Sequence, residues 1–158
     1  MRNARIWAAT AAASPIVFPV LTIAVAYLVD AITGTGADVA WYLVFTLLLG
    51  TAWFLPGIGL TLIGIVVLPR RSGAVLTVLA LVLLVLASAA MGVGVFDDAL
   101  SPLDDQPRLI PMLSIPEAVA VVAPYALVVL ACLRAAVPVI AAARGVATTA
   151  DAPDAVPS

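Results

Sequence analysis

The sequence predicts an all-α, polytopic membrane protein, namely a bundle of four transmembrane helices with the N and C termini in the cytoplasm. Three observations support this prediction. Of the 158 residues, 65% are hydrophobic and only 10% are charged, and the mean hydropathy is +1.23. Long uncharged intervals separate the charges, and arginines and acidic residues alternate between the ends of these intervals. A soluble domain carries roughly 25% charged residues, so lipid must surround most of this chain.

The uncharged intervals locate the spans. Three of them hold 24, 31 and 25 residues, and each exceeds the roughly 20 apolar residues that a helix needs to cross hydrocarbon. The fourth, from Glu117 to Arg134, holds only 16, so the last span must include Arg134 or borrow residues 109–115. We expect helices at about 6–32, 40–68, 73–96 and 116–143. Together they form one transmembrane domain over residues 1–145, and the aperiodic residues 146–158 are predicted to form a disordered cytoplasmic tail.

The placement of arginine predicts the orientation. Arginines flank one side of the predicted membrane at Arg2, Arg5, Arg70, Arg71 and Arg144, whereas the connections on the other side are acidic. The positive-inside rule then places both termini and the loop 69–72 in the cytoplasm, and the loops 33–39 and 97–115 outside the plasma membrane. Aromatic residues typical of membrane interfaces agree, with Trp7 at the inner end and Tyr27, Trp41, Tyr42 and Phe96 at the outer end. The alanine- and valine-rich, lysine-free composition is typical of GC-rich bacterial genomes.

The N-terminal segment permits a second interpretation. Met1 to Arg5, the apolar run that follows and Ala24-Val25-Ala26 resemble a cleavable signal peptide. The run is longer than the usual apolar core of such peptides and contains Pro15 and Pro19. Retention as the first span is therefore the favoured interpretation.

The second span contains a predicted helix break at Pro56, Gly57 and Gly59. Proline removes a backbone donor and clashes with the preceding turn, and the glycines soften the same turn. In transporters, a break of this kind exposes carbonyls to a substrate. The favoured interpretation is a packing kink, because the polar groups of a midplane site are missing from the surrounding sequence.

Small residues predict the contacts between helices. In the third span, Ser88 and Gly92 recur at i, i+4, as do Ala90 and Gly94. Lipid supplies no hydrophobic drive for helices to associate, so close backbone approach at small residues carries much of the packing. These stripes serve contacts within the chain or dock a partner subunit, and the intramolecular interpretation is the default.

Two charged residues invite functional interpretations. Arg134 is expected to snorkel to the cytoplasmic headgroups, and the alternative is that it binds an anionic lipid or a partner's carboxylate. Ser114 and Glu117 match a capping box at the start of the fourth helix. The carboxylates of the acidic loop, such as Asp97 and Asp104, match no metal-binding loop, so no metal site is predicted.

The composition also argues against most catalytic and cofactor-binding sites. The chain has no His, its seven cationic side chains are all arginine, and Cys132 is its one cysteine. No catalytic constellation, cofactor or nucleic-acid partner is therefore predicted. The leading hypothesis is a non-enzymatic structural, assembly or accessory subunit that packs on a membrane-protein partner or on copies of itself, within the lipid bilayer. The alternative is a small oligomeric transporter or channel that uses the break from Pro56 to Gly59.

Overall fold

A computed structural model describes residues 2–68, 70–100 and 113–150 of the chain. Its four helices are α1 (Arg2–Thr33), α2 (Ala37–Val67), α3 (Arg71–Leu100) and α4 (Ile115–Ala150). The described part contains helices and short connections only, and each helix includes a stretch that is long and apolar enough to cross a membrane. The prediction of an all-helical chain with four such helices is confirmed.

The helices extend beyond most of the predicted spans of 6–32, 40–68, 73–96 and 116–143. Hydropathy measures only what the hydrocarbon requires, whereas a helix continues until a stop signal ends it. The largest difference lies in α4, which continues through residues 146–150, where a disordered tail was expected to begin. Between Pro138 and Pro153 the sequence has no proline, so residues 146–150 include none that would interrupt a helix. Residues 151–158, and Asp104 and Asp105 of the acidic loop, lie outside the described residues.

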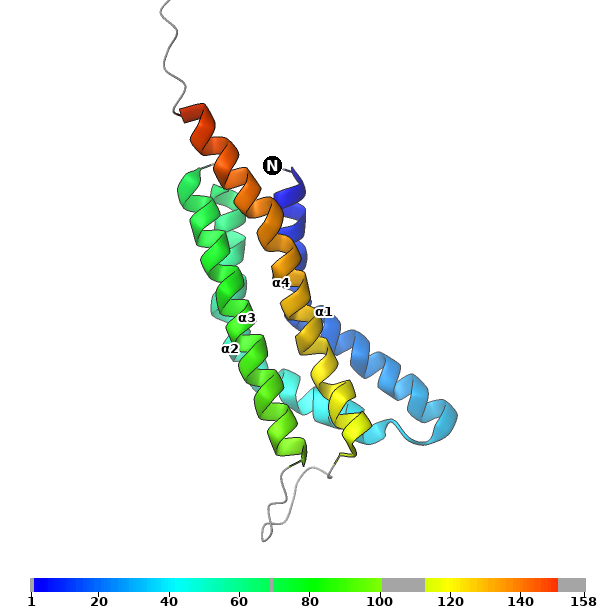
Figure 1. Cartoon of the computed structure of the whole chain (residues 1–158). Coiled ribbons are helices and arrows are strands. Elements are labelled where there is room, and N and C mark those ends of the chain that lie inside the picture. The colour runs from blue at the N-terminus through cyan, green and yellow to red at the C-terminus, as the bar shows by residue number, and fades with distance from the viewer. Residues whose placement is uncertain (1, 69, 101–112, 151–158) are drawn as a thin grey trace, which may run out of the picture.

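The four helices form an up-and-down bundle (Figure 1). Each packs on two neighbours, in the cyclic order α1, α2, α3, α4, and the diagonal pairs barely touch. Because the number of helices is even, the start of α1 and the end of α4 lie at the same end of the bundle (Figure 1). We call this the arginine end, since Arg5, Arg71 and Arg144 lie there, and we call the opposite end, with Asp30 and Glu117, the acidic end.

A short turn joins α1 to α2 at the acidic end. The carboxylate of Asp30 accepts hydrogen bonds from the backbone N–H groups of Gly36 at 2.9 Å and Ala37 at 3.1 Å. Gly34 has φ +71°, a conformation that glycine adopts without strain. A Cβ atom at Gly36 would lie 2.9 Å from the backbone nitrogen of Asp30, so no larger residue fits there. Asp30 therefore caps the start of α2 from the end of α1.

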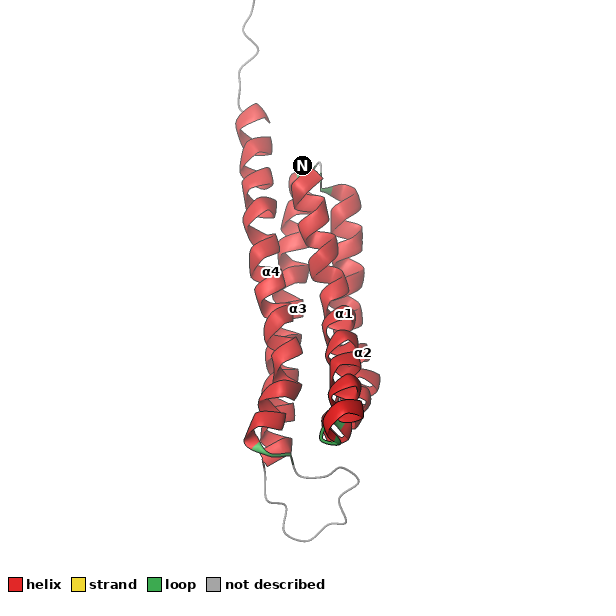
Figure 2. Cartoon of the chain, turned by 90° about the vertical axis from the view of Figure 1, so that its right-hand side faces the viewer, coloured by secondary structure: helices red, strands yellow, loops and turns green. Residues whose placement is uncertain are grey.

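The α1–α2 pair is bent. α1 contains the buried Pro15 and Pro19, and α2 contains Pro56. A proline inside a helix lacks the backbone donor and clashes one turn back, so it kinks the helix. The halves of α1 and α2 near the acidic end lean away from α3 and α4 (Figures 1 and 2).

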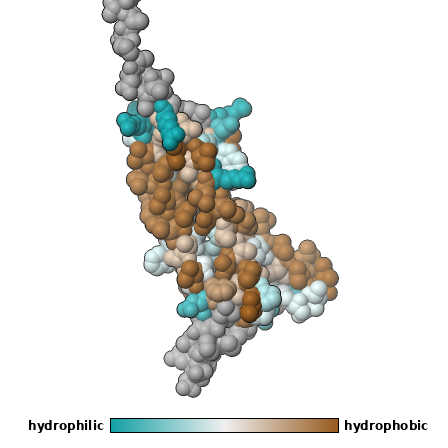
Figure 3. Space-filling model, viewed as in Figure 1, coloured by the Kyte–Doolittle hydropathy of each residue, from teal (hydrophilic) through white to brown (hydrophobic). Residues whose placement is uncertain are grey.

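The surface between the two ends is apolar. Figure 3 shows hydrophobic side chains over the middle of one face, with hydrophilic residues toward the arginine end. Large exposed side chains include Val66 at 77% exposed, Leu48 at 74% and Trp53 at 72%. A soluble monomer rarely carries an exposed apolar patch larger than a few hundred Å².

Candidate functional site

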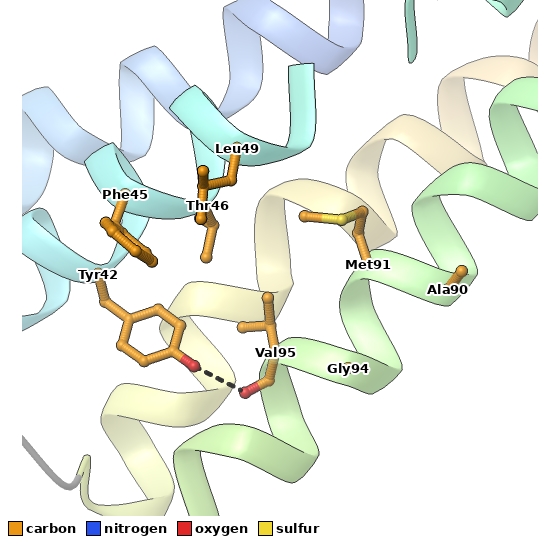
Figure 4. Close-up of a pocket in the computed structure, with 8 residues that line it drawn as sticks. All are labelled: Tyr42, Phe45, Thr46, Leu49, Ala90, Met91, Gly94 and Val95. Carbon is orange, nitrogen blue, oxygen red and sulfur yellow. Dashed lines mark hydrogen bonds between the residues drawn. The ribbon is translucent and has the colours of Figure 1, made fainter. Parts of the chain in front are cut away.

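A hollow of about 280 Å³ lies between α2 and α3, in the half of the bundle near the acidic end (Figure 4). Its wall from α2 consists of Tyr42, Phe45, Thr46 and Leu49, and its wall from α3 consists of Ala90, Met91, Gly94 and Val95. Four of these residues, namely Phe45, Leu49, Ala90 and Gly94, are exposed. The hollow therefore faces the outside of the bundle, and we call these four residues the Gly94 face.

Buried hydroxyl groups form the inner side of this hollow. The Tyr42 hydroxyl donates to the backbone carbonyl of Val95 at 3.4 Å (Figure 4). The Tyr125 hydroxyl, from α4, donates to Thr46 Oγ1 at 3.1 Å, and Thr46 Oγ1 donates to the carbonyl of Leu43 at 3.1 Å. A buried hydroxyl without a partner is costly in an apolar environment. Each hydroxyl here is held by the protein itself, so the cluster links α2, α3 and α4.

An aromatic contact extends the cluster toward the centre of the bundle. The rings of Phe54 and Tyr125 stack with centroids 6.4 Å apart and planes 10° apart. Both side chains belong to the larger of two buried apolar clusters. This stacking fixes the ring of Tyr125, whose hydroxyl then reaches α2.

The position of Tyr42 differs from the prediction. Tyr27, Trp41 and Phe96 are exposed, as residues of an interfacial belt must be, but Tyr42 is only 3% exposed whereas Trp41 is 64% exposed. Successive residues of an α-helix point about 100° apart, so Trp41 and Tyr42 cannot share a direction. Hydropathy alone does not show which of the two faces inward. The relevant signal was the spacing of Tyr42 and Thr46 at i, i+4, which places two hydroxyls on one face.

The structure separates the two small-residue pairs predicted in α3. Ser88 is buried, and its hydroxyl donates to the carbonyl of Leu84 at 2.7 Å. A Cβ atom at Gly92 would lie 3.7 Å from side-chain atoms of both Tyr125 and Val122, so α4 covers this glycine. Ser88 and Gly92 therefore serve packing within the chain.

Ala90 and Gly94 lie on the exposed side of α3. A Cβ atom at Gly94 would meet no atom within 4 Å. A second hollow, of about 600 Å³, borders Gly94 on the side of Val93 and Asp97. Gly94 thus stands between two hollows, and the backbone of α3 is accessible there.

A close seam joins α2 to α3. On α2, Gly50, Gly57 and Gly64 recur every seven residues, and the residues of α3 that face them recur every seven in reverse order. An added Cβ atom would lie 2.5 Å from Met91 Cε at Gly50, 2.7 Å from Leu84 Cδ2 at Gly57 and 3.1 Å from the Thr77 backbone nitrogen at Gly64. A seven-residue repeat keeps one face of a helix on its neighbour. We call these three contacts the α2–α3 seam.

The helix is not interrupted at Pro56, Gly57 and Gly59, where the sequence suggested a break. α2 continues as one helix through Pro56, which is exposed on the outside of the bundle. Leu84 occupies the space beside Gly57, whereas a Cβ atom at Gly59 would meet nothing within 4 Å. The buried Thr61 hydroxyl donates to the Gly57 carbonyl at 2.7 Å. The helix therefore continues on both sides of Pro56, although Pro56 itself donates no backbone hydrogen bond.

The two predicted charged features lie far apart. Arg134 is exposed on α4. At the acidic end, the carboxylate of Glu117 accepts from the Ser114 backbone N–H at 2.7 Å and from the Ser114 hydroxyl at 2.6 Å. The first of these is one half of a capping box, whereas the serine hydroxyl bonds to the carboxylate rather than to a backbone N–H. Glu117 therefore holds the start of α4.

Metal-ligating side chains do not gather in the described ranges. Within residues 2–68, 70–100 and 113–150, no three His, Cys, Asp or Glu side chains lie close enough together to hold a metal ion. Cys132 is a buried free thiol inside the bundle. The chain matches no protein-family model, no curated protein and no solved structure. The geometry of the bundle is therefore the basis for a functional proposal.

Proposed function

We propose that the chain is an integral membrane protein of the bacterial plasma membrane, with its arginine end and both termini in the cytoplasm. Side chains such as Leu48 and Trp53 point outward from the middle of the bundle, where water would oppose their exposure and lipid would not. The arginines at one end agree with the positive-inside rule. The loop 34–36 would then lie outside the cell, and the end of α2 and the start of α3 would lie inside.

We further propose that the protein is a non-enzymatic structural, assembly or accessory subunit that binds a transmembrane helix of another chain at the Gly94 face. The observation that carries this proposal is the open position of Gly94 between two hollows. The other small-residue pair predicted in α3, Ser88 and Gly92, is used for packing within the chain. Ala90 and Gly94, by contrast, are exposed, and the Gly94 face joins them to an open hollow between α2 and α3.

The chemistry of this face suits a helix rather than a polar substrate. Between helices in lipid there is no hydrophobic driving force, because the lipid tails are as apolar as the side chains. Helices therefore associate where small residues let their backbones approach closely. Ala90 and Gly94 supply the small residues, and Phe45 and Leu49 supply an apolar wall opposite them. The hydroxyls of Thr46 and Tyr125 are engaged within the chain, so the contact is one of shape and dispersion.

A matched pair of substitutions tests the proposed contact. Gly94→Leu fills the approach to the α3 backbone, while Gly59→Leu makes the same change at a glycine of α2 that also has open space around it. Each variant is purified from native membranes in mild detergent, and the co-purified chains and the oligomeric mass are measured. Gly94→Leu should remove the partner or the oligomer without lowering the yield, and Gly59→Leu should retain it.

Two outcomes would contradict the proposal. One is that both variants retain the same partners in the same proportion. The other is that the unsubstituted chain is a dispersed monomer that binds no other chain in detergent or in native membranes. A heteromeric partner and a second copy of this chain are distinguished by the mass of the complex.

A further inference from the structure

The arginine end carries a second feature that packing alone does not explain. A hollow of about 360 Å³ lies between the start of α3 and the end of α4. Its charged lining residues are Arg71 and Arg144, one from each helix, and its apolar lining includes Val75, Val78 and Ile140. Both arginines are exposed. The hollow is therefore open to its surroundings and has one charged end.

The lining residues are ordered along the helix axis. Arg71 begins α3, and Val75 and Val78 follow one and two turns further into the bundle. Since an α-helix rises 1.5 Å per residue, Val78 lies about 10 Å deeper than Arg71. Because α4 runs in the opposite direction to α3, Ile140 lies one turn deeper in the bundle than Arg144. Positive charge thus lies at the rim of the hollow, and an apolar wall continues below it.

This arrangement matches the form of an anionic phospholipid. The headgroup phosphate of such a lipid lies at the membrane surface, and its acyl chains run down along the apolar wall of a protein. Arginine presents a planar fork of donors that suits phosphate, and basic pockets between helices on the cytoplasmic side bind anionic headgroups. A carboxylate of a partner protein would use the arginines but would leave the apolar wall below them unexplained.

The charge distribution of the described residues favours the same ligand. Their acidic side chains, such as Asp30, Asp38 and Glu117, lie toward the acidic end. The arginine end instead gathers positive charge, with Arg5 and Arg70 in addition to the two lining arginines. An anionic headgroup is the complementary ligand for that end.

We propose that the hollow between α3 and α4 binds an anionic phospholipid, with its phosphate between Arg71 and Arg144 and one acyl chain along Val75, Val78 and Ile140. This inference rests on the membrane placement proposed above and is independent of the Gly94 face. It moves the lipid contact from Arg134, where the sequence suggested one, to the pair at the end of the bundle. Arg134 lies about 15 Å from Arg144 along α4.

Native mass spectrometry of the purified full chain tests the proposal. The chain in detergent is titrated with phosphatidylglycerol, and in parallel with phosphatidylcholine that carries the same acyl chains. The chain should bind phosphatidylglycerol more tightly. Arg71→Gln and Arg144→Gln should each lower its affinity by about fivefold, the effect expected of one basic residue near an anionic surface. Arg134→Gln is the matched control and should leave it unchanged.

Further variants keep the test decisive. If the glutamine variants fail to fold, Arg71→Lys and Arg144→Lys keep the positive charge and should retain binding, with a weaker preference for phosphatidylglycerol. Val75→Trp keeps both arginines but fills the apolar wall, and it should weaken binding of the two-chain lipid. Inorganic phosphate added in excess should not displace phosphatidylglycerol, because it lacks the acyl chain.

Three results would overturn the inference. The first is equal affinity for the two lipids, and the second is equal loss of binding in Arg134→Gln. The third is displacement of the lipid by inorganic phosphate, which would indicate a site for free anions. Gly94→Leu should bind phosphatidylglycerol as the unsubstituted chain does. Loss of the partner in that variant with lipid binding retained therefore separates this inference from the proposed partner contact.

Discussion

Two glycines of α2, only two positions apart, have opposite surroundings. A Cβ atom at Gly57 would lie 2.7 Å from Leu84 Cδ2, whereas a Cβ atom at Gly59 would meet nothing within 4 Å. Residues two positions apart in an α-helix point about 200° apart around the helix axis, so one glycine faces α3 and the other faces outward. The same residue type therefore serves close packing at one position and leaves open surface at the other.

The same contrast divides the α2–α3 seam from the Gly94 face. Gly50, Gly57 and Gly64 are in contact with α3 at three successive levels of α2, whereas a Cβ atom at Gly94 of α3 would meet no atom within 4 Å. If this division is real, substitutions in the seam should affect stability, and substitutions at open glycines should affect only contacts with other molecules. Each prediction below tests that division, beginning with the largest expected effect.

Gly64→Leu should cause the largest loss of stability. Its Cβ atom would lie 3.1 Å from the Thr77 backbone nitrogen and 3.2 Å from the Thr77 Cα atom, and backbone atoms cannot move aside as a side chain can. Overpacking of a well-packed interface costs about 1–3 kcal/mol. The midpoint of unfolding by sodium dodecyl sulfate, followed by circular dichroism, measures the effect. An unchanged midpoint would show that α2 and α3 are not in close contact at this position.

Gly57→Ala should destabilise less, by about 1 kcal/mol, because the obstructing atoms belong to the side chain of Leu84. The double variant Gly57→Ala with Leu84→Ala should be more stable than the two single effects predict, since the new methyl group occupies part of the space that the leucine leaves. A double-mutant cycle on the unfolding free energy isolates this coupling. Simple additivity would mean that the two residues do not touch.

Tyr125→Phe should have a smaller effect, since it removes the hydroxyl that donates to Thr46 and leaves the ring stacked on Phe54. Hydrogen bonds between helices in membranes contribute about 0.6 kcal/mol on average. Tyr27→Phe, at an exposed position of α1, is the matched control and should leave the unfolding midpoint unchanged. Equal effects in both variants would argue against a buried hydroxyl cluster.

Gly59→Ala should have the smallest effect on stability, and unlike the other substitutions it should not lower the unfolding free energy. The new methyl group meets no atom within 4 Å, and alanine favours the helix over glycine by up to about 1 kcal/mol in an exposed helix interior. The variant should be as stable as the parent chain or slightly more stable. A loss comparable to that of Gly57→Ala would show that the two glycines do not differ as described.

Much of the fold was predictable because a helix that is long and apolar enough to cross a membrane is visible in the composition and in the spacing of charges. Uncharged intervals of sufficient length located the first three helices. A shorter interval, together with the capping residues Ser114 and Glu117, located the fourth. The bounds differed most at the end of α4, because hydropathy does not report where a helix beyond the hydrocarbon ends. The capping of α2 by Asp30 across the turn depends on the geometry of that turn, which composition does not report.

The candidate sites were less predictable because they depend on which face of each helix points inward. Ser88 with Gly92 and Ala90 with Gly94 have the same spacing, and only the position of α4 shows that the first pair is covered. The seam was visible in principle, as glycine at every seventh position of α2. The pairing of Arg71 with Arg144 required the packing of α3 on α4, which a single sequence does not provide.

Site-specific photo-crosslinking in native membranes tests the proposed role of the Gly94 face most directly. A benzophenone amino acid is placed at Leu49, which lines the hollow beside Gly94 and is 62% exposed, or at Leu62, which is 53% exposed elsewhere on α2. If the Gly94 face receives a helix of another chain, Leu49 should give an adduct of one discrete mass and Leu62 should give none. Equal adducts from both positions, or none from Leu49, would contradict that role.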